Sequence, residues 1–361
     1  MNVEQVNQHL IGEDLVYHYY RMQSEPIRYL SLGIEITDKC NAKCGICYQS
    51  AGIHNSCVID VNVAKKCIRE AASSSCMGSR FHAVGGEAFL YPDVLFPLFE
   101  EAKASGFTEI SATTNCFWAK TEKNADAICA RMKNSGVTLL EISWDFWHAQ
   151  HNSAECINNC LIYCRKYGIR TNLRFLTTKS HSIEEALKML DPFAVRHACQ
   201  ISSSNVTPSG RAVEVLPREE FYGDAHGIDG MCADGLVLTI NSYGEAYPCC
   251  AGFDTCRDCN FGNINDSSII DIMDNMNSDP MLRQLVFLGP KSYYKILTDC
   301  GCNVPEENRF VSRCDFCHFI FSNENRTNII RTHFEKLQQE SIEKAIAVLE
   351  KKLSTKGSKN E

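Results

Sequence analysis

From about residue 30 to about residue 203, the chain alternates between two hydrophobic patterns. Short apolar runs typical of strands are separated by segments with helical periodicity. The strand-like runs span residues 32–37, 81–84, 109–113, 139–144, 171–176 and 200–203, and the helical segments span residues 61–74, 93–105, 122–135, 153–167 and 183–191. Strands that alternate with helices in this way predict parallel β/α units. Six such units predict an open or closed α/β barrel.

The pattern changes at about residue 204. Residues 206–212 are rich in turn-forming types, and the stretch that follows is rich in cysteine, with strand-like pieces on either side of a turn at residues 241–244. Residues 326–353 have the spacing of a long amphipathic helix and precede a polar tail. We therefore predict an N-terminal segment, a barrel, a small cysteine-rich domain, and a C-terminal helix with its tail, over residues 1–29, 30–215, 216–325 and 326–361.

Composition limits the partners and the cellular compartment that we expect for the protein. A net charge of −8 over 361 residues argues against a nucleic-acid-binding surface, which is normally basic. The 21 cysteines are an odd number, and they fall below the density of small disulfide-rich scaffolds. Because no signal sequence precedes them, we expect a cytoplasmic protein with reduced thiols. No stretch approaches the roughly 18 uninterrupted apolar residues of a membrane-spanning helix, so we expect no membrane partner.

Cys40, Cys44 and Cys47 place three thiols directly after the first predicted strand. A [4Fe-4S] cluster usually takes four thiolates, so a group of three leaves one iron open to a substrate or cofactor. Zinc is the alternative, although zinc ligands more often come as separated Cys-x2-Cys pairs. Catalytic loops of α/β barrels lie at the C-terminal ends of the strands, so this position predicts a catalytic cluster.

Polar residues follow several of the later strands. Gly85 and Gly86 come after the second strand and let the backbone pass close to a ligand, while the carboxylate of Glu87 can accept hydrogen bonds from an ammonium group. Further polar side chains stand at or near the ends of the third, fourth and fifth strands: Thr114, Asn115, Ser143, Asp145 and Arg174. The first four either contact a ligand or cap a strand end or turn, whereas Arg174 either points inward toward a ligand or covers the barrel rim.

Two other groups have competing interpretations. The aromatic and titratable residues 144–148, with His151, could line a substrate pocket or supply an acid and a base, but we favour a packed loop with satisfied histidines. Cys156, Cys160 and Cys164 share one helix face. Because a thiol packs as a small apolar group, we interpret them as a buried stripe rather than a ligand row.

The Cys-x3-Cys-x2-Cys spacing at the opening of a β/α barrel, together with residues 85–87, resembles the radical S-adenosylmethionine (radical SAM) superfamily. The resemblance implies a partial (β/α)6 TIM-type barrel in which Cys40, Cys44 and Cys47 hold a [4Fe-4S] cluster. It also implies that SAM binds the open iron and contacts Glu87 and the polar residues named above. Reductive cleavage would then give methionine and a 5′-deoxyadenosyl radical, which takes a hydrogen atom from the substrate. Ile46 and Ala88 depart from the family's usual aromatic residue and proline.

Cys232 and Cys249 bracket a predicted β-hairpin, and Cys314 with Cys317 forms a distant Cys-x2-Cys pair. This arrangement resembles the SPASM and twitch domains of some radical SAM enzymes, and it implies that these four cysteines ligate at least one auxiliary [4Fe-4S] cluster. Cysteines expected later in a full SPASM pattern are missing, which favours the twitch form. Other cysteines could hold a second cluster or include a thiol that donates a hydrogen atom to a substrate radical, as in radical epimerases: Cys250, Cys256, Cys259, Cys300 and Cys302.

These features together predict a radical SAM oxidoreductase or maturase. We expect it to abstract hydrogen from a ribosomally made peptide or other natural-product precursor, with oxidation, crosslinking or epimerisation as the outcome. The alternative substrate is an amino sugar or cyclitol, which a dehydrogenase or epimerase of this kind would act on. A non-catalytic, zinc-stabilised binding protein is the alternative of another class. For the enzyme, we also expect an external one-electron reductant such as flavodoxin or ferredoxin.

Overall fold

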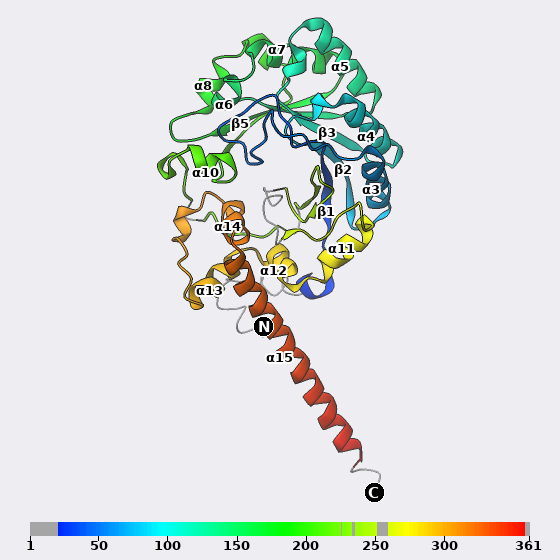
Figure 1. Cartoon of the computed structure of the whole chain (residues 1–361), viewed down its shortest axis with the longest axis vertical. Coiled ribbons are helices and arrows are strands. Elements are labelled where there is room, and N and C mark those ends of the chain that lie inside the picture. The colour runs from blue at the N-terminus through cyan, green and yellow to red at the C-terminus, as the bar shows by residue number, and fades with distance from the viewer. Residues whose placement is uncertain (1–20, 225, 233–234, 251–258, 358–361) are drawn as a thin grey trace.

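A single eight-stranded sheet forms the centre of the computed structural model, which describes residues 21–224, 226–232, 235–250 and 259–357 (Figure 1). The strand order is β6-β5-β4-β3-β2-β1-β7-β8. The first six strands pair in parallel and occupy Tyr29–Glu35, Met77–Val84, Glu109–Thr114, Leu139–Ser143, Arg170–Thr177 and Gln200–Asn205. The predicted alternation of strands and helices is therefore confirmed, and the sheet curves into a partial barrel.

The two faces of each barrel strand have different environments. On β2, Phe81 and Ala83 are fully buried against the outer helices, whereas Arg80 is exposed and His82 bonds to the hydroxyls of Ser111 and Thr113 on the inner face. The outer layer consists of α3, α4, α5 and α7, which span Val61–Ser73, Pro92–Ala104, Glu122–Asn134 and Ala154–Lys166 (Figure 1). Because successive side chains of a strand point to opposite faces, the buried apolar ones face the helices and the polar ones line the inside of the barrel.

Local signals explain where these helices begin. The Asp60 side chain accepts hydrogen bonds from the first turn of α3, and Thr121 does the same for α5, which is the usual work of an N-cap. One expectation was wrong in detail. The helix predicted over residues 183–191 ends early, because α8 spans only Ile183–Leu187. A separate helix that was not predicted, α9, spans Pro192–Val195 with Asp191 as its N-cap.

The cysteine-rich half joins the barrel through its hairpin. Strand β7, Val237–Ile240, pairs in parallel with β1, and β8, Ala246–Tyr247, returns antiparallel to β7. Four helices follow in the order α11, α12, α13 and α14, over Ile269–Ser278, Pro280–Leu288, Lys291–Asp299 and Arg313–Phe321. The hairpin therefore extends the barrel sheet, so that strands from both predicted domains form a single sheet.

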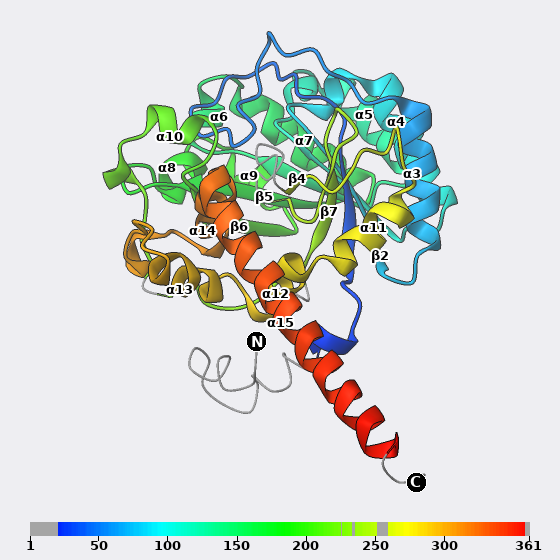
Figure 2. The same cartoon turned by 60° about the horizontal axis from the view of Figure 1, so that its bottom comes forward.

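The last helix, α15, spans Glu324–Gly357 and runs away from the body of the molecule (Figures 1 and 2). Its first turns pack through Ile330 and Phe334, which are buried in the main core. In the part of the chain that the structure describes, no helix is both long enough and apolar enough to cross a membrane.

Candidate active site

The three clustered cysteines lie on the loop between β1 and α3, residues 36–52, which we call the cysteine loop. Cys40 and Cys44 are buried and Cys47 is half-buried. The loop folds back on itself, with the Cys47 amide donating to the Cys44 carbonyl at 3.2 Å and the Cys40 amide to the Gly52 carbonyl at 3.1 Å. Burial, with smaller effects from charge on Glu87, Cys44 and Cys47, raises the pKa of the Cys40 thiol to about 12. The fold therefore gathers the three thiols at one place.

The two glycines after β2 let the chain cross the cysteine loop at close range. The Gly86 amide donates to the Thr37 carbonyl at 2.7 Å, and the Glu87 amide donates to the Lys39 carbonyl at 2.9 Å. A Cβ atom on Gly86 would lie 2.2 Å from the Lys39 carbonyl oxygen, and Gly85 has a φ of 142° that other residues rarely adopt. This crossing fixes the backbone immediately before Cys40.

The Glu87 carboxylate points into the protein and holds the end of β3. Its Oε1 accepts hydrogen bonds from the Thr114 hydroxyl at 2.9 Å and the Phe89 amide at 3.2 Å, and its Oε2 accepts one from the Asn115 amide at 2.8 Å. Glu87 is 1% exposed, and this burial raises the pKa of its carboxyl to about 7. In this arrangement Glu87 organises Thr114 and Asn115, which we had expected to face SAM beside it.

The remaining polar candidates take different positions. Asp145 is the N-cap of α6, Phe146–Ala149, and its Oδ1 accepts from the amides of Trp147 and His148 at 3.0 Å each. Arg174 lies on the inner face of β5 and forms a 2.6 Å ion pair with Glu141 of β4. Ser143 is half-buried at the end of β4, opposite Arg174 in register. Asp145 thus has the capping geometry that was the alternative to ligand contact.

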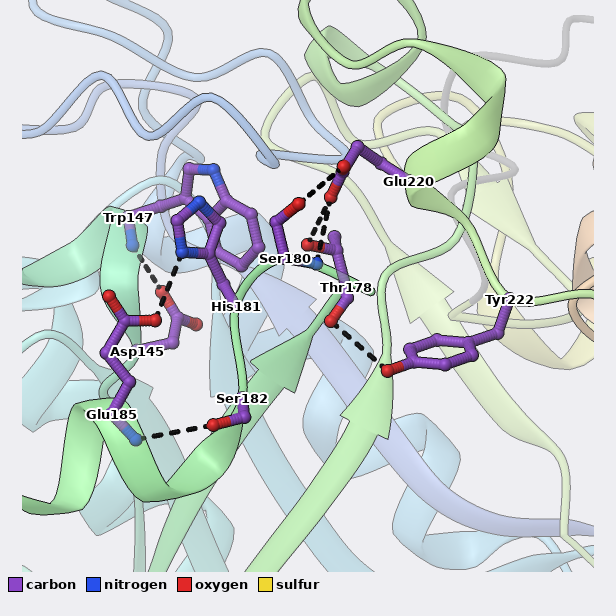
Figure 3. Close-up of polar contacts among 9 residues, drawn as sticks. All are labelled: Asp145, Trp147, Thr178, Ser180, His181, Ser182, Glu185, Glu220 and Tyr222. Atoms are coloured by element: carbon purple, nitrogen blue, oxygen red, sulfur yellow. Dashed lines mark hydrogen bonds and ion pairs between the residues drawn. The ribbon is translucent and has the colours of Figure 1, made fainter.

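The aromatic segment after β4 is packed, but residues 146–149 form the short helix α6 rather than a loop, and His151 is exposed. Trp147 is buried, and the His181 ring lies edge-on to it with 5.2 Å between ring centroids (Figure 3). Burial lowers the pKa of His148, but the charge of Asp145, with Nδ1 and Oδ1 2.8 Å apart, outweighs that effect, and a hydrogen bond with Cys44 adds to it. The net result is a pKa well above the usual value. His148 therefore lies directly beside the cysteine loop.

Arg211 is a residue that the sequence analysis missed. It starts α10, Arg211–Val215, and its guanidinium donates to the Cys44 and Ala51 carbonyls, both at 2.6 Å. Its own amide donates to the Cys47 carbonyl at 2.9 Å. The turn-rich segment at 206–212 marked its neighbourhood, but nothing in the local pattern indicates a contact with a loop some 160 residues earlier. Arg211 braces the cysteine loop from the end of the barrel.

The cysteines of the second half converge on one cavity. Five thiols line it together with apolar side chains of α12 and with Phe261 and Phe321, and they are Cys232, Cys249, Cys259, Cys314 and Cys317. Burial raises the pKa of the Cys314 thiol to about 11, with a smaller effect from the nearby Cys232. The four predicted ligands are thus brought together, and Cys259 joins them. We call this set the thiol cavity.

The other unassigned cysteines lie elsewhere. Cys250 is exposed, and a hydrogen bond with Cys249 and, more weakly, the positive charge of Arg174 lower the pKa of its thiol to about 7. Cys300 is exposed at the end of α13, and Cys302 is half-buried against the core. Cys256 lies outside the described residues. Cys250 is therefore within electrostatic range of the inner face of the barrel.

The stripe on α7 is buried, as expected. Cys156, Cys160 and Cys164 are all fully enclosed, and the Cys164 sulfur lies 3.7 Å from that of Cys129 on α5. These thiols pack between two outer helices, on the opposite face of the sheet from the barrel interior. They contribute to the core rather than to the candidate site.

The thiols of the cysteine loop and of the thiol cavity could bind either a zinc ion or an iron-sulfur cluster. Thiolates bound to one zinc ion at about 2.3 Å must lie roughly 4 Å apart. Among the described residues, no three histidine, cysteine, aspartate or glutamate side chains converge closely enough for such an ion. An iron-sulfur cluster binds each thiolate through a different iron and tolerates wider spacing. Three thiols on one loop, and a cavity lined by thiols and apolar side chains, supply the thiolate ligands that an iron-sulfur cluster takes.

Comparisons with known proteins support this interpretation. Residues 34–192 match the family model described as the radical SAM superfamily, and residues 232–303 match the model of an iron-sulfur cluster-binding domain, SPASM. The chain is 26% identical over 325 residues to the putative peptide biosynthesis protein YydG of Bacillus subtilis strain 168, covering 86% of this chain and 98% of that protein. It is also 22% identical over 256 residues to GTP 3′,8-cyclase of Lactiplantibacillus plantarum, covering 63% of this chain and 74% of that one.

Solved structures agree on the fold. Native anSMEcpe with bound AdoMet superposes with a TM-score of 0.54 at 16% identity, covering 88% of this chain and 98% of that one. SuiB of Streptococcus suis, bound to S-adenosylmethionine, gives a TM-score of 0.54 at 17% identity, covering 81% of this chain and 75% of the other. At this level of identity, the likeness extends to the fold alone.

Proposed function

Because the chain belongs to the radical SAM superfamily and carries an iron-sulfur cluster-binding domain after its barrel, we propose that it modifies a peptide by abstracting a hydrogen atom. The geometric observation behind this proposal is that two separate thiol sets are attached to strands of the same sheet. The cysteine loop follows β1, and the thiol cavity includes Cys249, just after β8. Strand β7 joins the two through its pairing with β1.

The two matched domains imply SAM with a [4Fe-4S] cluster and an auxiliary iron-sulfur cluster. When bound, these groups supply the one-electron cleavage of SAM to methionine and a 5′-deoxyadenosyl radical, with an external reductant such as flavodoxin or ferredoxin as electron source. Cys40, Cys44 and Cys47 would hold the first cluster. Cys232, Cys249, Cys314 and Cys317 would hold the second. The residues of the chain position these groups and keep water away from them.

The relative YydG supports a peptide as the substrate. It is named as a putative peptide biosynthesis protein, and the match extends over nearly its whole length. We therefore propose a ribosomally made precursor peptide as the substrate. Activity on an amino sugar or cyclitol instead would contradict this proposal. The family membership also sets aside a non-catalytic zinc protein.

Among the possible outcomes we propose epimerisation, with Cys250 as the hydrogen-atom donor. Its thiol is exposed, and the adjacent Cys249 lines the thiol cavity. In this reaction a hydrogen atom would leave an α-carbon of the peptide for the radical that bound SAM supplies, and Cys250 would give the hydrogen atom of its S–H bond to the opposite face. The resulting thiyl radical needs one electron and one proton, for which the external reductant and solvent suffice.

The experiment uses the full chain, reconstituted anaerobically with iron and sulfide and reduced in D2O with SAM and a precursor peptide encoded beside its gene. We expect 5′-deoxyadenosine and a peptide with solvent deuterium at an inverted α-carbon, detected by mass spectrometry and chiral amino-acid analysis. Cys250→Ala should still form 5′-deoxyadenosine but lose deuterium incorporation. Cys300→Ala, which removes another exposed thiol, should behave as wild type.

Different results would separate the parts of this proposal. Loss of two hydrogens or a crosslink would identify oxidation and reject epimerisation. Deuterium incorporation that survives in Cys250→Ala would reject Cys250 as the donor. Turnover of an amino sugar or cyclitol, with none of any peptide, would reject the substrate class.

A further inference from the structure

A second pocket opens where the barrel meets the cysteine-rich half. It has a volume of about 490 Å³ and lies between the loop after β5, the 3-10 turn Arg218–Glu220, and the 3-10 turn Glu307–Arg309. This size is within the range of typical ligand pockets. Its walls come from both halves of the chain, so it forms only when the two halves are assembled.

Cationic side chains dominate the charged groups of this pocket. Lys179, Arg218 and Arg309 line it, against the single carboxylate of Glu219. Arg218 lies 3.9 Å from the buried Asp315, which is a loose ion pair. Within the described part of the chain, neither the Lys179 ammonium nor the Arg309 guanidinium is paired with a carboxylate. A positive pocket is unexpected in a chain of net charge −8.

The framework around the pocket is held by a different set of polar contacts. Glu220 accepts hydrogen bonds from the Ser180 hydroxyl at 2.6 Å and the Thr178 hydroxyl at 2.9 Å, and Tyr222 donates to the Thr178 carbonyl at 3.3 Å (Figure 3). The Lys179 amide also donates to the Glu220 carbonyl. Glu220 is therefore occupied by the loop it supports, and the three cations are left facing the pocket.

The pocket adjoins the candidate active site. The loop after β5 and the segment after β6 both leave the C-terminal ends of parallel strands, the edge on which the cysteine loop also lies. Phe221, which lines the pocket, belongs to the small apolar cluster that contains Cys40, Cys44 and Trp147. The pocket thus shares Phe221 with the apolar cluster that surrounds the cysteine loop.

From these contacts we infer that acidic side chains of the peptide substrate dock in this pocket. The inference rests on the proposed function, since it supplies the anchor for the peptide. Aspartate or glutamate carboxylates would pair with Lys179 and Arg309, and the rings of Phe221 and Tyr222 would contact the adjoining chain. A peptide held here would extend over the nearby mouth of the barrel.

The test measures binding separately from radical chemistry. The probe is a fluorescein-labelled hexapeptide whose four central residues alternate aspartate and glutamate, compared with a peptide carrying asparagine and glutamine instead. By fluorescence anisotropy on the reconstituted full chain, we expect the acidic probe to bind about tenfold more tightly. The double variant Lys179→Glu with Arg309→Glu should lose this preference. Lys123→Glu, an exposed charge reversal on α5, should keep it.

The outcomes are distinct. Equal binding of the two probes to the wild-type chain, or a preference that persists in the double variant, overturns the inference. Arg309→Gln provides a milder change and should weaken the acidic probe by a smaller factor. SAM cleavage without peptide is measured in parallel. If that cleavage is absent from the wild type, the proposed function fails whatever the probe does, whereas normal cleavage with no acidic preference rejects only the docking pocket.

Discussion

At the scale of single residues, Glu87 shows what the structure adds to the sequence. The local motif of two glycines and a glutamate predicted a contact with SAM, which stays a prediction. The structure adds that the Glu87 oxygens accept hydrogen bonds from Thr114, Asn115 and Phe89, and that the side chain is almost fully enclosed. The partners come mainly from the end of another strand, so no local pattern could reveal them. Glu87 acts by positioning its neighbours.

This burial predicts a pH dependence. Because the folded-state pKa of Glu87 is raised to about 7 from 4.5, its neutral form is favoured in the fold, and the associated stability is complete below pH 4.5 and lost as the pH rises through 7. We expect the unfolding free energy of wild type relative to Glu87→Gln to fall by about 1–3 kcal/mol between pH 5 and 8. Urea denaturation of both chains without clusters measures this difference, and a difference that is constant with pH would contradict it.

At the scale of elements, the crossing of the β2 turn over the cysteine loop controls the position of the first thiol. The sequence predicted the need for glycine there, because two successive glycines after a strand indicate close approach. It could not show whether a ligand or the chain itself approaches. The structure shows the backbone of residues 37–39 in that place.

Gly86→Ala is therefore expected to displace Lys39 and the adjoining Cys40. A Cβ atom 2.2 Å from a carbonyl oxygen cannot be accommodated without backbone movement, which costs about 1–3 kcal/mol. We expect lower iron incorporation at the first cluster and reduced 5′-deoxyadenosine formation. Gly235→Ala is the matched control, since a Cβ atom there meets no described atom within 4 Å. Equal iron content in the two variants would contradict the prediction.

The helices also separate local signals from long-range ones. Their positions and N-caps, such as Asp60 and Thr121, can be predicted from sequence because those signals are local. The start of α9 is also encoded locally, because Asp191 is its N-cap and Pro192 its first residue. By contrast, the hydrogen bonds of Arg211 to the cysteine loop are long-range contacts that follow only from the assembled barrel.

At the scale of the whole molecule, the pairing of β7 with β1 makes the auxiliary hairpin part of the barrel sheet. The sequence predicted two domains with a boundary near residue 215, and it predicted the hairpin. It could not predict that hairpin's pairing partner, because strand register between distant segments is set by packing. The thiol cavity is consequently fixed relative to the cysteine loop.

Removal of one thiol tests whether the two sites are independent. We expect Cys317→Ala to lose about half of the bound iron while its SAM cleavage persists, because Cys317 lines only the thiol cavity. Cys259→Ala should keep its iron if the four predicted ligands hold the cluster. Iron analysis and electron paramagnetic resonance of the two variants measure this. If Cys259→Ala lost iron and Cys249→Ala retained it, Cys259 would be the cluster ligand in place of Cys249.

The strand order has a consequence for how a substrate arrives. The sheet begins at β6 and finishes at β8, and these two ends are not paired in the part of the chain that the structure describes. In a fully closed barrel, a polymer reaches a site at the C-terminal ends of the strands only from that end. An open barrel can also admit the middle of a long chain through the gap at its side. We therefore expect a modified residue to lie well inside its peptide, with long flanks on both sides passing out of the enzyme.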